Sequence, residues 1–458
     1  MDGDMAALPP GPRIPKLLAT YQLLAQPMRY YPRWRRRYGD PFPLSAINGT
    51  VVTTGRADLI ETIFRADHRI YAPFGVEAVG PVVGASSIFT LQGSAHRRER
   101  KLMMPAFHGA RMRAYATAMA RAADDGFVAA GDGGRLQDAM QAISLDVILR
   151  AVFGLDDEEN PQGYAEAIVG LIDSVHPALL FMPFLQRRLG GVGPYARFLE
   201  RFEAVDELLD AQIERRRARP GEDILSMMLA SRYEDDTQMS NEQLKDELRA
   251  LVVAGHETSA LALSWAVDAV LRHPMVERRL RAEIDALGED PDPEALAKLP
   301  YLDAVCKETM RRHPIVTESL RLLKEPMVLG DHELDAGLTV SPSILLAHYD
   351  PETFPEPERF DPDRFMEKSY GPFSYLPFGG GHRRCVGAAF AQFEMKIVLG
   401  RLLARYDVEL RSPLPPRPVR RNITLAPHDG VPAQLTPRKG RVSKAVPPHA
   451  VANHQAAT

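Results

Sequence analysis

The stretch from Ser240 to Arg272 constrains the fold of this chain more than any other segment. Ser240-Asn-Glu-Gln243 has the form of a capping box, in which the serine and the glutamine satisfy backbone donors at a helix start. From Leu248 to Leu271 the residues are largely apolar on every side. A helix of this kind has to be buried, so the sequence predicts a large body packed around one long helix.

The remaining pattern predicts a fold that is mainly α with a small β-rich region. Helical periodicity dominates residues 94–312 and returns at 386–406, whereas short strand-like runs lie at 42–54 and 320–346. With 458 residues, 45% of them hydrophobic and 25% charged, the chain has ample material for a core and is not disordered. We find no repeat and no convincing linker between domains.

Charge and cysteine content exclude several classes of protein. A net charge of −4 provides no global basic field for nucleic acid, and two cysteines cannot form a disulfide framework, which fits a reducing cytoplasm. The apolar run 178–185 is less than half of the roughly 20 residues that span a membrane. Residues 1–7 lack the basic flank and apolar core of an export signal. We therefore expect a cytoplasmic protein without a transmembrane anchor.

The most informative short motif is Phe378-Gly-Gly-Gly-His-Arg-Arg-Cys-Val-Gly387. Three glycines let the backbone approach a flat, bulky group, and the two arginines can bond an anion. The lone thiolate of Cys385 is a strong, soft ligand for iron. The stretch therefore has the composition of a haem-thiolate loop.

A glycine-rich motif with a cysteine can also belong to a phosphate loop, a dinucleotide loop or a zinc site. A phosphate loop needs Gly-Lys-Ser/Thr, and a dinucleotide loop needs a final glycine where Arg384 stands. A structural zinc site is disfavoured because the other cysteine, Cys306, lies far away. A buried cysteine in a turn stays an alternative for Cys385 taken alone.

A polar cluster, Ala254-Gly-His-Glu-Thr-Ser259, interrupts the long apolar helix. Its mid-helix glycine costs about 1 kcal/mol relative to alanine. The Thr258 hydroxyl can bond back to the Ala254 carbonyl or leave it open, and Glu257 beside it forms an acid-alcohol pair suited to proton transfer. A structural role explains the cluster equally well: Gly255 would allow close helix packing, and the Thr258 and Ser259 hydroxyls would bond to backbone carbonyls of their own helix.

A structural ion-pair network is predicted upstream of the cysteine loop. Glu308 and Arg311 are three residues apart, so they share one helix face. Arg359, in the irregular stretch that follows, offers a second guanidinium for the same carboxylate. We expect these three residues to hold the cysteine loop in place rather than to act in catalysis.

Together these motifs resemble those of the cytochrome P-450 family of haem-thiolate monooxygenases, from the Pro-rich entry near Leu8 through the helix after Cys385. The family signature Phe-x-x-Gly-x-x-x-Cys-x-Gly is matched by Phe378, Gly381, Cys385 and Gly387. The acid-alcohol motif is matched by Ala254, Gly255, Glu257 and Thr258. The Glu-x-x-Arg motif and its completing arginine are matched by Glu308, Arg311 and Arg359.

The resemblance implies a fold, a cofactor and a reaction. The fold is a triangular, mostly helical body with a small β-rich side and haem between the long central helix and the helix after the Cys loop. Residues 1–436 would form a single catalytic domain, and 437–458 a disordered tail. The cofactor is haem b, with Cys385 as proximal iron ligand, and its propionates would be held by His96, Arg100, Arg321 and Arg383. His96 replaces the tryptophan of many members.

The resemblance also implies partners. The enzyme would insert oxygen from O2 into a lipophilic small molecule, by hydroxylation or epoxidation, as a monomer. Since the segment after Cys385 is short for a flavin-bearing domain, electrons are expected from a ferredoxin or flavodoxin with its NAD(P)H-dependent reductase. A basic stretch could dock that donor or be only a solvated helix face; it comprises Arg97, Arg98, Lys101, Arg111, Arg113 and Arg384.

Two apolar segments are expected to line or gate the substrate pocket, Tyr71 to Gln92 and Val175 to Gly193. Fatty acids, terpenoids and steroid-like compounds all fit this prediction. A peroxygenase or hydroperoxide isomerase is disfavoured by Glu257-Thr258. A non-enzymatic haem gas sensor is disfavoured because no partner or DNA-binding module is recognised.

Overall fold

The structure is a computed structural model that describes residues 8–72, 76–107, 109, 111–175 and 193–438. The chain divides into two compact units. The strand-rich unit comprises Met1–Gly75, Ala304–Ala388 and Pro416–His428. The helical unit comprises Val76–Asp303, Ala389–Pro415 and Asp429–Thr458.

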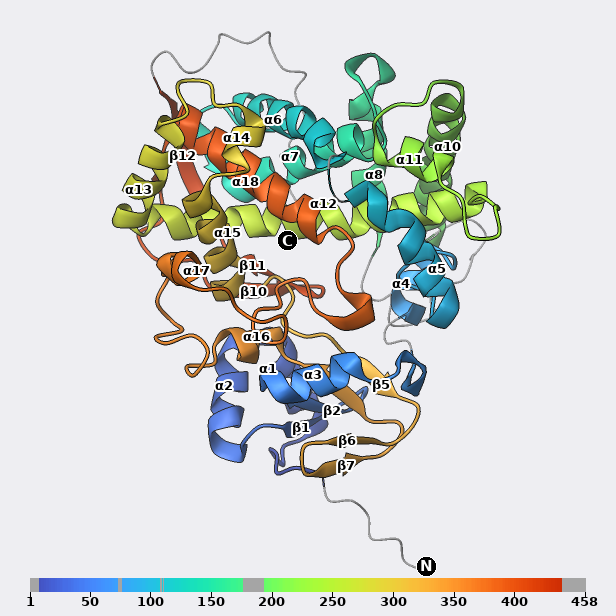
Figure 1. Ribbon diagram of the computed structural model, residues 1–458, viewed down its shortest axis with the longest axis vertical. Helices are drawn as coiled ribbons and strands as arrows, with labels where there is room; N and C mark the ends of the chain where they lie inside the picture. Colours follow the sequence, from blue (N-terminus) through green and yellow to red (C-terminus); the bar gives the residue numbers. More distant parts are fainter. Residues whose placement is uncertain (1–7, 73–75, 108, 110, 176–192, 439–458) are drawn as a thin grey trace, which may run out of the picture. The chain divides into compact units, whose positions relative to one another are not determined.

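The strand-rich unit combines the N-terminal helices with most of the strands (Figure 1). Its helices are α1 (Lys16–Ala25), α2 (Pro27–Tyr38), α3 (Ala57–Arg65), η1 (His68–Ile70), α16 (Ile344–His348), α17 (Asp363–Glu367) and η5 (Gly381–Arg383). Its strands are β1 (Phe42–Ala46), β2 (Gly49–Thr54), β3 (Tyr71–Ala72), β5 (Arg321–Leu323), β6 (Met327–Leu329), β7 (His332–Leu334), β8 (Thr339–Pro342), β10 (Pro418–Arg421) and β11 (Thr424–Pro427).

A five-stranded sheet in the order β1-β2-β8-β5-β3 organises this unit. Its β2–β8 pair is parallel, with Val51 opposite Thr339, and its other pairs are antiparallel. The hairpins β6-β7 and β10-β11 lie outside this sheet. Core residues from α3 and the sheet pack together, including Leu59, Ile63 and Val340. The sheet therefore fixes α3, which contacts the cysteine loop described below.

Amphipathic spacing explains α2. Tyr31 and Trp34 are buried against Phe42 and Leu44 of β1, and Pro27 supplies the first-turn proline that suits a helix start. The helix ends where Gly39 takes a φ of 92° that favours glycine. This burial fixes which face of α2 points inward and leaves Arg29, Arg33, Arg36 and Arg37 exposed.

The helical unit contains the long helices. They are α4 (Val76–Val83), α5 (Gly93–Met103), η2 (Met104–Phe107), α6 (Arg111–Ala129), α7 (Leu136–Ala151), η3 (Asp157–Glu159), α8 (Pro161–Ser174), α10 (Pro194–Ala218), α11 (Ile224–Ala230), α12 (Asn241–Leu271), α13 (Pro274–Asp285) and α14 (Pro293–Leu296). A three-stranded sheet in the order β4-β12-β9 belongs here, with β4 (Gly133–Arg135), β9 (Tyr406–Leu410) and β12 (Pro432–Pro437). Two helices, α15 (Pro300–Arg312) and α18 (Ala388–Arg405), cross the boundary between units.

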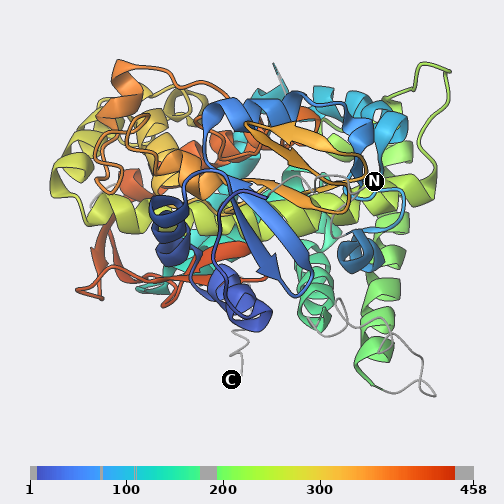
Figure 2. The same cartoon turned by 90° about the horizontal axis from the view of Figure 1, so that it is seen from below.

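The predicted central helix is confirmed as α12, an uninterrupted helix in Figure 2. Ser240 accepts from the Gln243 N–H and the Gln243 side chain accepts from the Ser240 N–H, so the predicted capping box is present. By length and composition α12 is the one helix in the described residues that could span a membrane, but 61% of its most apolar window is buried within the protein. It is accordingly a core helix.

Several other predicted helices and strands can be compared with the elements of the structure. The predicted strands at 42–54 and the last helix are confirmed as β1, β2 and α18. Residues 344–348 form α16 instead of continuing the β-type run, because Ser343 caps a helix start by accepting from the Leu346 N–H. Most of the predicted lid segment 175–193, and residues 439–458 of the predicted tail, lie outside the described residues. The predicted start of the disordered tail at 437 was wrong, because Pro437 ends β12 and Arg438 pairs with Asp285 at 2.9 Å.

Candidate functional site

The cysteine loop of the strand-rich unit is a tight turn held by its own backbone. The Gly379 N–H donates to the Leu376 carbonyl at 2.9 Å, and the Cys385 N–H donates to the Phe378 carbonyl at 3.0 Å. Gly379 and Gly381 both have a φ of 65°, a conformation that other residues rarely adopt. Cys385 is exposed at the end of this loop, whereas Cys306 is buried in α15. The side chain of Cys385 thus reaches solvent at the end of this loop.

Phe64 of α3 packs directly against this loop. A side chain at Gly380 would place its Cβ only 2.5 Å from the Phe64 ring, and one at Gly381 would lie 2.9 Å from the Phe64 carbonyl oxygen. Two of the three consecutive glycines are therefore required by close approach. Phe64 was not predicted as a site residue, although its spacing of four residues from buried Ile60 marks it as an inward-facing residue of an amphipathic helix.

Arg321 lies at the same place, with its guanidinium 6.0 Å from the centre of the Phe64 ring. Burial lowers the pKa of Arg321, because the charged guanidinium loses hydration. No acidic side chain of the described residues pairs with it, and its Nη1 bonds only the neighbouring Leu320 carbonyl, at 2.9 Å. A desolvated cation near Phe64 and an exposed thiol on the loop that packs against Phe64 fit a group that carries iron and carboxylates.

The other predicted propionate ligands are distributed over both units. Arg383 belongs to η5 within the cysteine loop. His96 and Arg100 lie on α5 of the helical unit, where His96 is buried and Arg100 half-buried. Because two of the four cations belong to each unit, their joint action stays a prediction.

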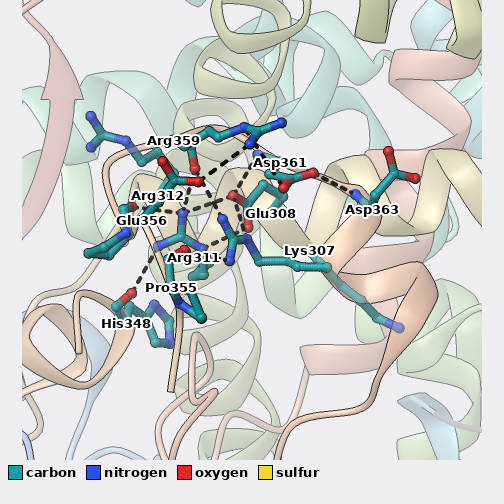
Figure 3. A network of polar contacts seen from close by, with 12 residues as sticks. Lys307, Glu308, Arg311, Arg312, His348, Pro355, Glu356, Arg359, Asp361 and Asp363 are labelled. Carbon is teal, nitrogen blue, oxygen red and sulfur yellow. Dashed lines mark hydrogen bonds and ion pairs between the residues drawn. The ribbon is translucent and has the colours of Figure 1, made fainter. Parts of the chain in front are cut away.

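The predicted pair of Glu308 and Arg311 is present and completely buried (Figure 3). Arg311 donates from Nε and Nη2 to the two carboxylate oxygens, at 2.7 and 2.8 Å. Its remaining donors reach the carbonyls of His348 at 2.9 Å and Pro357 at 2.9 Å. Each of the three guanidinium nitrogens donates at least one hydrogen bond, which offsets the penalty of burying the ion pair.

The third member of the network is Arg364, and the prediction that the Arg359 guanidinium shares Glu308 is wrong. Arg364 is 8% exposed and donates from Nε to Glu308 at 3.2 Å. The Arg359 side chain is 63% exposed and pairs with Glu356, while its backbone carbonyl accepts from Arg311 at 3.1 Å. The turn therefore directs the Arg359 carbonyl inward. The sequence repeats Pro-x-Arg-Phe at 357–360 and 362–365, and the second copy was the signal overlooked.

His348 connects the network to the cysteine loop. Burial and the nearby Arg311 lower the pKa of His348 to about 3, so its ring is neutral. A neutral ring can accept at Nε2, and there it accepts from the Leu376 N–H at 3.0 Å. Tyr375 stacks on the same ring and donates to the Lys307 carbonyl at 3.0 Å. The buried ion pair thereby fixes the chain immediately before Phe378.

In the helical unit, the Thr258 hydroxyl donates to the Ala254 carbonyl at 2.5 Å, which is the back-bonded alternative. Gly255 faces α7, where an added Cβ would lie 3.2 Å from Ile148 Cδ1. Ala254, Glu257 and Thr258 are only half-buried, and the neighbouring Val253 is 39% exposed. The acid-alcohol residues thus occupy the uncovered part of an otherwise buried helix.

Two titratable groups near this motif were not predicted. Burial lowers the pKa of His256 to about 4, so that ring is neutral. Glu394 of α18 is fully buried, and burial raises its pKa to about 7 against the opposing effect of hydrogen bonds from Ser259 and Ser144. Its Oε1 has no hydrogen-bond partner among the described residues. A carboxyl that is still partly protonated at neutral pH therefore lies beside the residue that follows Thr258.

The predicted basic docking stretch is partly neutralised within the helical unit. Arg98 pairs with Asp235 at 2.9 Å and lies over the Tyr233 ring, while Lys101 pairs with Glu234 at 2.5 Å. The exposed charge of the stretch is correspondingly reduced. Of the other residues assigned to it, Arg97 and Arg113 are exposed.

Comparison with known proteins gives consistent results. The family model of cytochrome P450 matches residues 8–430. The chain is 34% identical over 442 residues to cytochrome P450 135B1 of Mycobacterium tuberculosis, covering 92% of this chain and 90% of that protein. It is 35% identical over 450 residues to cytochrome P450 135A1 of the same organism, covering 94% and 96%.

Solved structures resemble the fold closely. The retinoic acid-bound cyanobacterial CYP120A1 has a TM-score of 0.81 and 25% identity, covering 95% of this chain and 100% of that one. The haem domain of cytochrome P450DA has a TM-score of 0.83 and 21% identity, covering 95% and 98%. The predicted mainly α fold with small sheets is therefore confirmed.

This fold and the cysteine loop define a class of oxidoreductases that incorporate oxygen and bind haem through a thiolate. The chain belongs to the cytochrome P450 family. Members of this family bind haem b through a cysteine thiolate, and the exposed thiol and desolvated arginine of the strand-rich unit fit that group.

Proposed function

We propose that Cys385 is the thiolate ligand of the haem iron and that the enzyme hydroxylates or epoxidises a lipophilic small molecule with electrons from a separate protein. The observation that carries this proposal is the exposed Cys385 thiol on a backbone fixed by Phe64 and by the Glu308 network. A loop built in this way keeps the cysteine backbone in one position through its turn hydrogen bonds and its packing on Phe64. That rigidity is what a metal ligand requires.

Haem, when bound, supplies the oxygen-activating chemistry, because a thiolate ligand pushes electron density to the iron and favours O–O cleavage. The chain's own residues then have simpler tasks. Arg321 and Arg383 of the strand-rich unit would bind the propionates, and the same role for His96 and Arg100 of the helical unit stays a prediction from the sequence. The backbone of Phe378, Gly381 and Gly387 would let the flat ring approach.

Thr258 and Glu257 are proposed to manage protons. The Thr258 hydroxyl donates to the Ala254 carbonyl, so its oxygen lone pairs remain able to accept a second hydrogen bond. Glu257, half-buried on the adjacent position, is a carboxyl within the same uncovered part of α12. The pair can hold a proton at the Thr258 oxygen and replace it from Glu257. Gly255 keeps the helix surface narrow at this point.

A lipophilic substrate is supported by two observations. Val253 and Ala254 provide an apolar uncovered surface next to the acid-alcohol pair. CYP120A1, a structural relative, binds retinoic acid, a terpenoid carboxylate. We therefore keep the substrate classes expected from the sequence, terpenoid, fatty-acid or steroid-like compounds, and choose retinoic acid as the first probe. The external donor is proposed to be a ferredoxin or flavodoxin with its NAD(P)H-dependent reductase.

The test of the thiolate uses the reduced, carbon-monoxide-bound protein. A strongly red-shifted Soret band is expected, and it should disappear in Cys385→Ala. Cys306→Ala is the matched control, since that cysteine is buried in α15, and it should keep the band. Loss of the band in the Cys306 variant alone would overturn the assignment.

The test of the proton role compares two hydroxyls that make the same bond. Thr258 donates to Ala254 at 2.5 Å and Ser264 donates to Ala260 at 2.7 Å, both on α12. With ferredoxin, reductase, NAD(P)H and a compound that displaces iron-bound water, Thr258→Ala should divert electrons to peroxide and lower the product yield several-fold. Ser264→Ala should leave coupling unchanged. Equal coupling in both variants contradicts the proton role, and full turnover with peroxide alone would instead favour a peroxygenase.

A further inference from the structure

The N-terminal part of the strand-rich unit carries a charge opposite to that of the whole chain. Residues 8–57 contain eight arginines or lysines and a single acidic residue, Asp40, although the chain as a whole has a net charge of −4. Asp40 does not offset the exposed cations, because it pairs with Arg35 at 3.2 Å. The β10-β11 hairpin of the same unit adds three arginines and no acidic residue across 416–428. The basic character is therefore concentrated on one set of neighbouring elements.

Exposed apolar side chains occur on these same elements. On α1, Leu17 is 74% exposed and Tyr21 is 59% exposed, four residues apart on one helix face, with Leu18 exposed beside them. The opposite side of α1 is anchored, since Ala19 is buried and the helix packs on β1. An isolated exposed leucine needs no explanation, but a helix face of three large apolar residues does.

The apolar surface continues onto the strands that contact α1. Ile47, in the turn between β1 and β2, is 54% exposed, and its N–H donates to the Thr20 hydroxyl of α1 at 3.0 Å. On the other side, β10 packs on α1, and Ile423 in the β10-β11 turn is 67% exposed. We call the surface formed by Leu17, Leu18, Tyr21 and Ile47 the α1 face.

Exposed cations border the α1 face. Arg13 and Lys16 are exposed at the start of α1. On α2, which packs on α1, Tyr31 and Trp34 point inward while Arg29, Arg33 and Arg36 are exposed at helical spacing on the other side. The arrangement is an apolar centre with a basic rim.

We propose that the α1 face docks this protein on the surface of a bilayer that contains anionic lipid. Leucine, isoleucine and tyrosine side chains enter the boundary between headgroups and acyl chains, and the arginines of the rim bind lipid phosphates. The docking is peripheral and reversible, because the helix lies on the membrane and does not cross it. The inference uses no feature of the haem site and does not depend on the proposed substrate.

An anionic membrane fits the α1 face and its exposed cations better than nucleic acid or an acidic protein does. Nucleic-acid binding relies on cations that contact phosphates and gains nothing from exposed leucines. An acidic protein partner would place complementary carboxylates against the cations, but the α1 face itself has an apolar centre. Only a lipid surface provides hydrocarbon and phosphate at adjacent depths.

The experiment is co-sedimentation of the full haem-loaded chain with vesicles of phosphatidylcholine alone and of phosphatidylcholine with phosphatidylglycerol. We expect binding to the anionic vesicles, weakened by added salt because screening acts over about 10 Å at 0.1 M. The variant Leu17→Ser/Leu18→Ser/Tyr21→Ser should bind more than about tenfold more weakly. Arg33→Glu/Arg36→Glu should weaken binding by a similar factor.

Matched controls use equally exposed residues elsewhere. Val328→Ser on β6 and Met275→Ser on α13 remove exposed apolar side chains, and Arg278→Glu/Lys298→Glu reverses two exposed cations. These controls should bind as the parent does. Circular dichroism and thermal unfolding monitor folding, and if the α1 variant unfolds, the Arg33/Arg36 variant decides.

Four results would overturn the inference. They are no binding to either vesicle, equal binding to neutral and anionic vesicles, equal losses in the control variants, and retention by nucleic acid or by an acidic protein without vesicle binding. The carbon-monoxide spectrum is recorded separately. A protein that binds vesicles but lacks the red-shifted band retains the docking inference and loses the proposed haem ligation.

Discussion

Two fully buried glutamates, one in each unit, have opposite environments. Glu308 in the strand-rich unit receives two bonds from Arg311, one from Arg364 and one from the Asp361 N–H at 2.9 Å. Glu394 in the helical unit has no cationic partner among the described residues, and burial raises its pKa to about 7. The first carboxylate is saturated with donors, whereas the second is short of them.

The difference separates a structural carboxylate from one that can exchange a proton. A carboxylate bonded by two guanidiniums is held in one position, so Glu308 serves to hold the backbone before the cysteine loop. A carboxyl that is hydrogen-bonded only by two serine hydroxyls is readily protonated near neutral pH. Glu394 can therefore hold a proton next to Ser259. Both glutamates are fully buried, so burial does not distinguish the structural role of Glu308 from the proton-exchanging role of Glu394. The number of hydrogen-bond donors around each carboxyl does.

The strongest test of this comparison is Glu308→Gln. The neutral amide leaves two buried guanidiniums without a counter-charge, so we expect the free energy of unfolding to fall by about 3–5 kcal/mol. Haem incorporation should fall with it, because the chain before Phe378 loses its anchor. Urea denaturation and haem content are the measurements. Glu358→Gln, which removes the exposed partner of Arg312, should cost less than about 1 kcal/mol.

The next effect is the pH dependence that Glu394 imposes on stability. Its pKa is about 7 in the folded protein and 4.5 ordinarily, so between these values the folded state keeps a proton that the unfolded state releases. The free energy of unfolding should therefore fall as pH rises through this window, by up to about 3 kcal/mol in all. Above the window the effect is constant.

Glu394→Gln removes this titration. Wild type and variant should be similarly stable near the acidic end of the window, and the variant should become relatively more stable as the pH approaches neutrality. Urea midpoints across the pH range measure the difference. Glu409→Gln, exposed on β9, should leave the pH profile unchanged. A parallel pair of profiles for wild type and Glu394→Gln would show that this carboxyl does not titrate as described.

The comparison also shows what a sequence can and cannot reveal. The pair Glu308–Arg311 was predictable because it depends on short-range spacing along one helix. Cys385 and Thr258 were identified from the same kind of short-range pattern, and their roles stay predictions. Arg364, Glu394 and Phe64 were not, because their importance comes from contacts between elements distant in the chain. The choice between Arg359 and Arg364 in particular depends on which of two turns directs a carbonyl inward, a backbone property that the repeated Pro-x-Arg-Phe does not encode.

That choice gives a smaller and more specific test. Arg364→Leu removes a charged hydrogen bond to buried Glu308 and should cost about 1.5–3 kcal/mol. Arg359 takes part in the network only through its backbone carbonyl, which Arg359→Leu keeps. Because the substitution removes only an exposed side chain, the free energy of unfolding should fall by less than about 0.5 kcal/mol. Urea midpoints of the two variants make the comparison. The reverse order would restore Arg359 as the third member of the network.

The smallest effect concerns the two explanations for Gly255. If the glycine exists only for close helix packing, Gly255→Ala should destabilise the protein. The added Cβ would meet just the end of the flexible Ile148 side chain, at 3.2 Å, and alanine gains about 1 kcal/mol of helix propensity. We therefore expect the free energy of unfolding to change by less than about 1 kcal/mol.

Gly126 of α6 is the matched control, because it also faces α7. An added Cβ there would lie 2.2 Å from Ile143 Cγ1, close to the backbone of a buried residue, so Gly126→Ala should destabilise by about 1–3 kcal/mol. With stability nearly unchanged in Gly255→Ala, any loss of coupling in that variant belongs to the chemistry beside Thr258. If both alanine variants are equally destabilised, packing alone explains the glycine, and the acid-alcohol residues lose one of their proposed members.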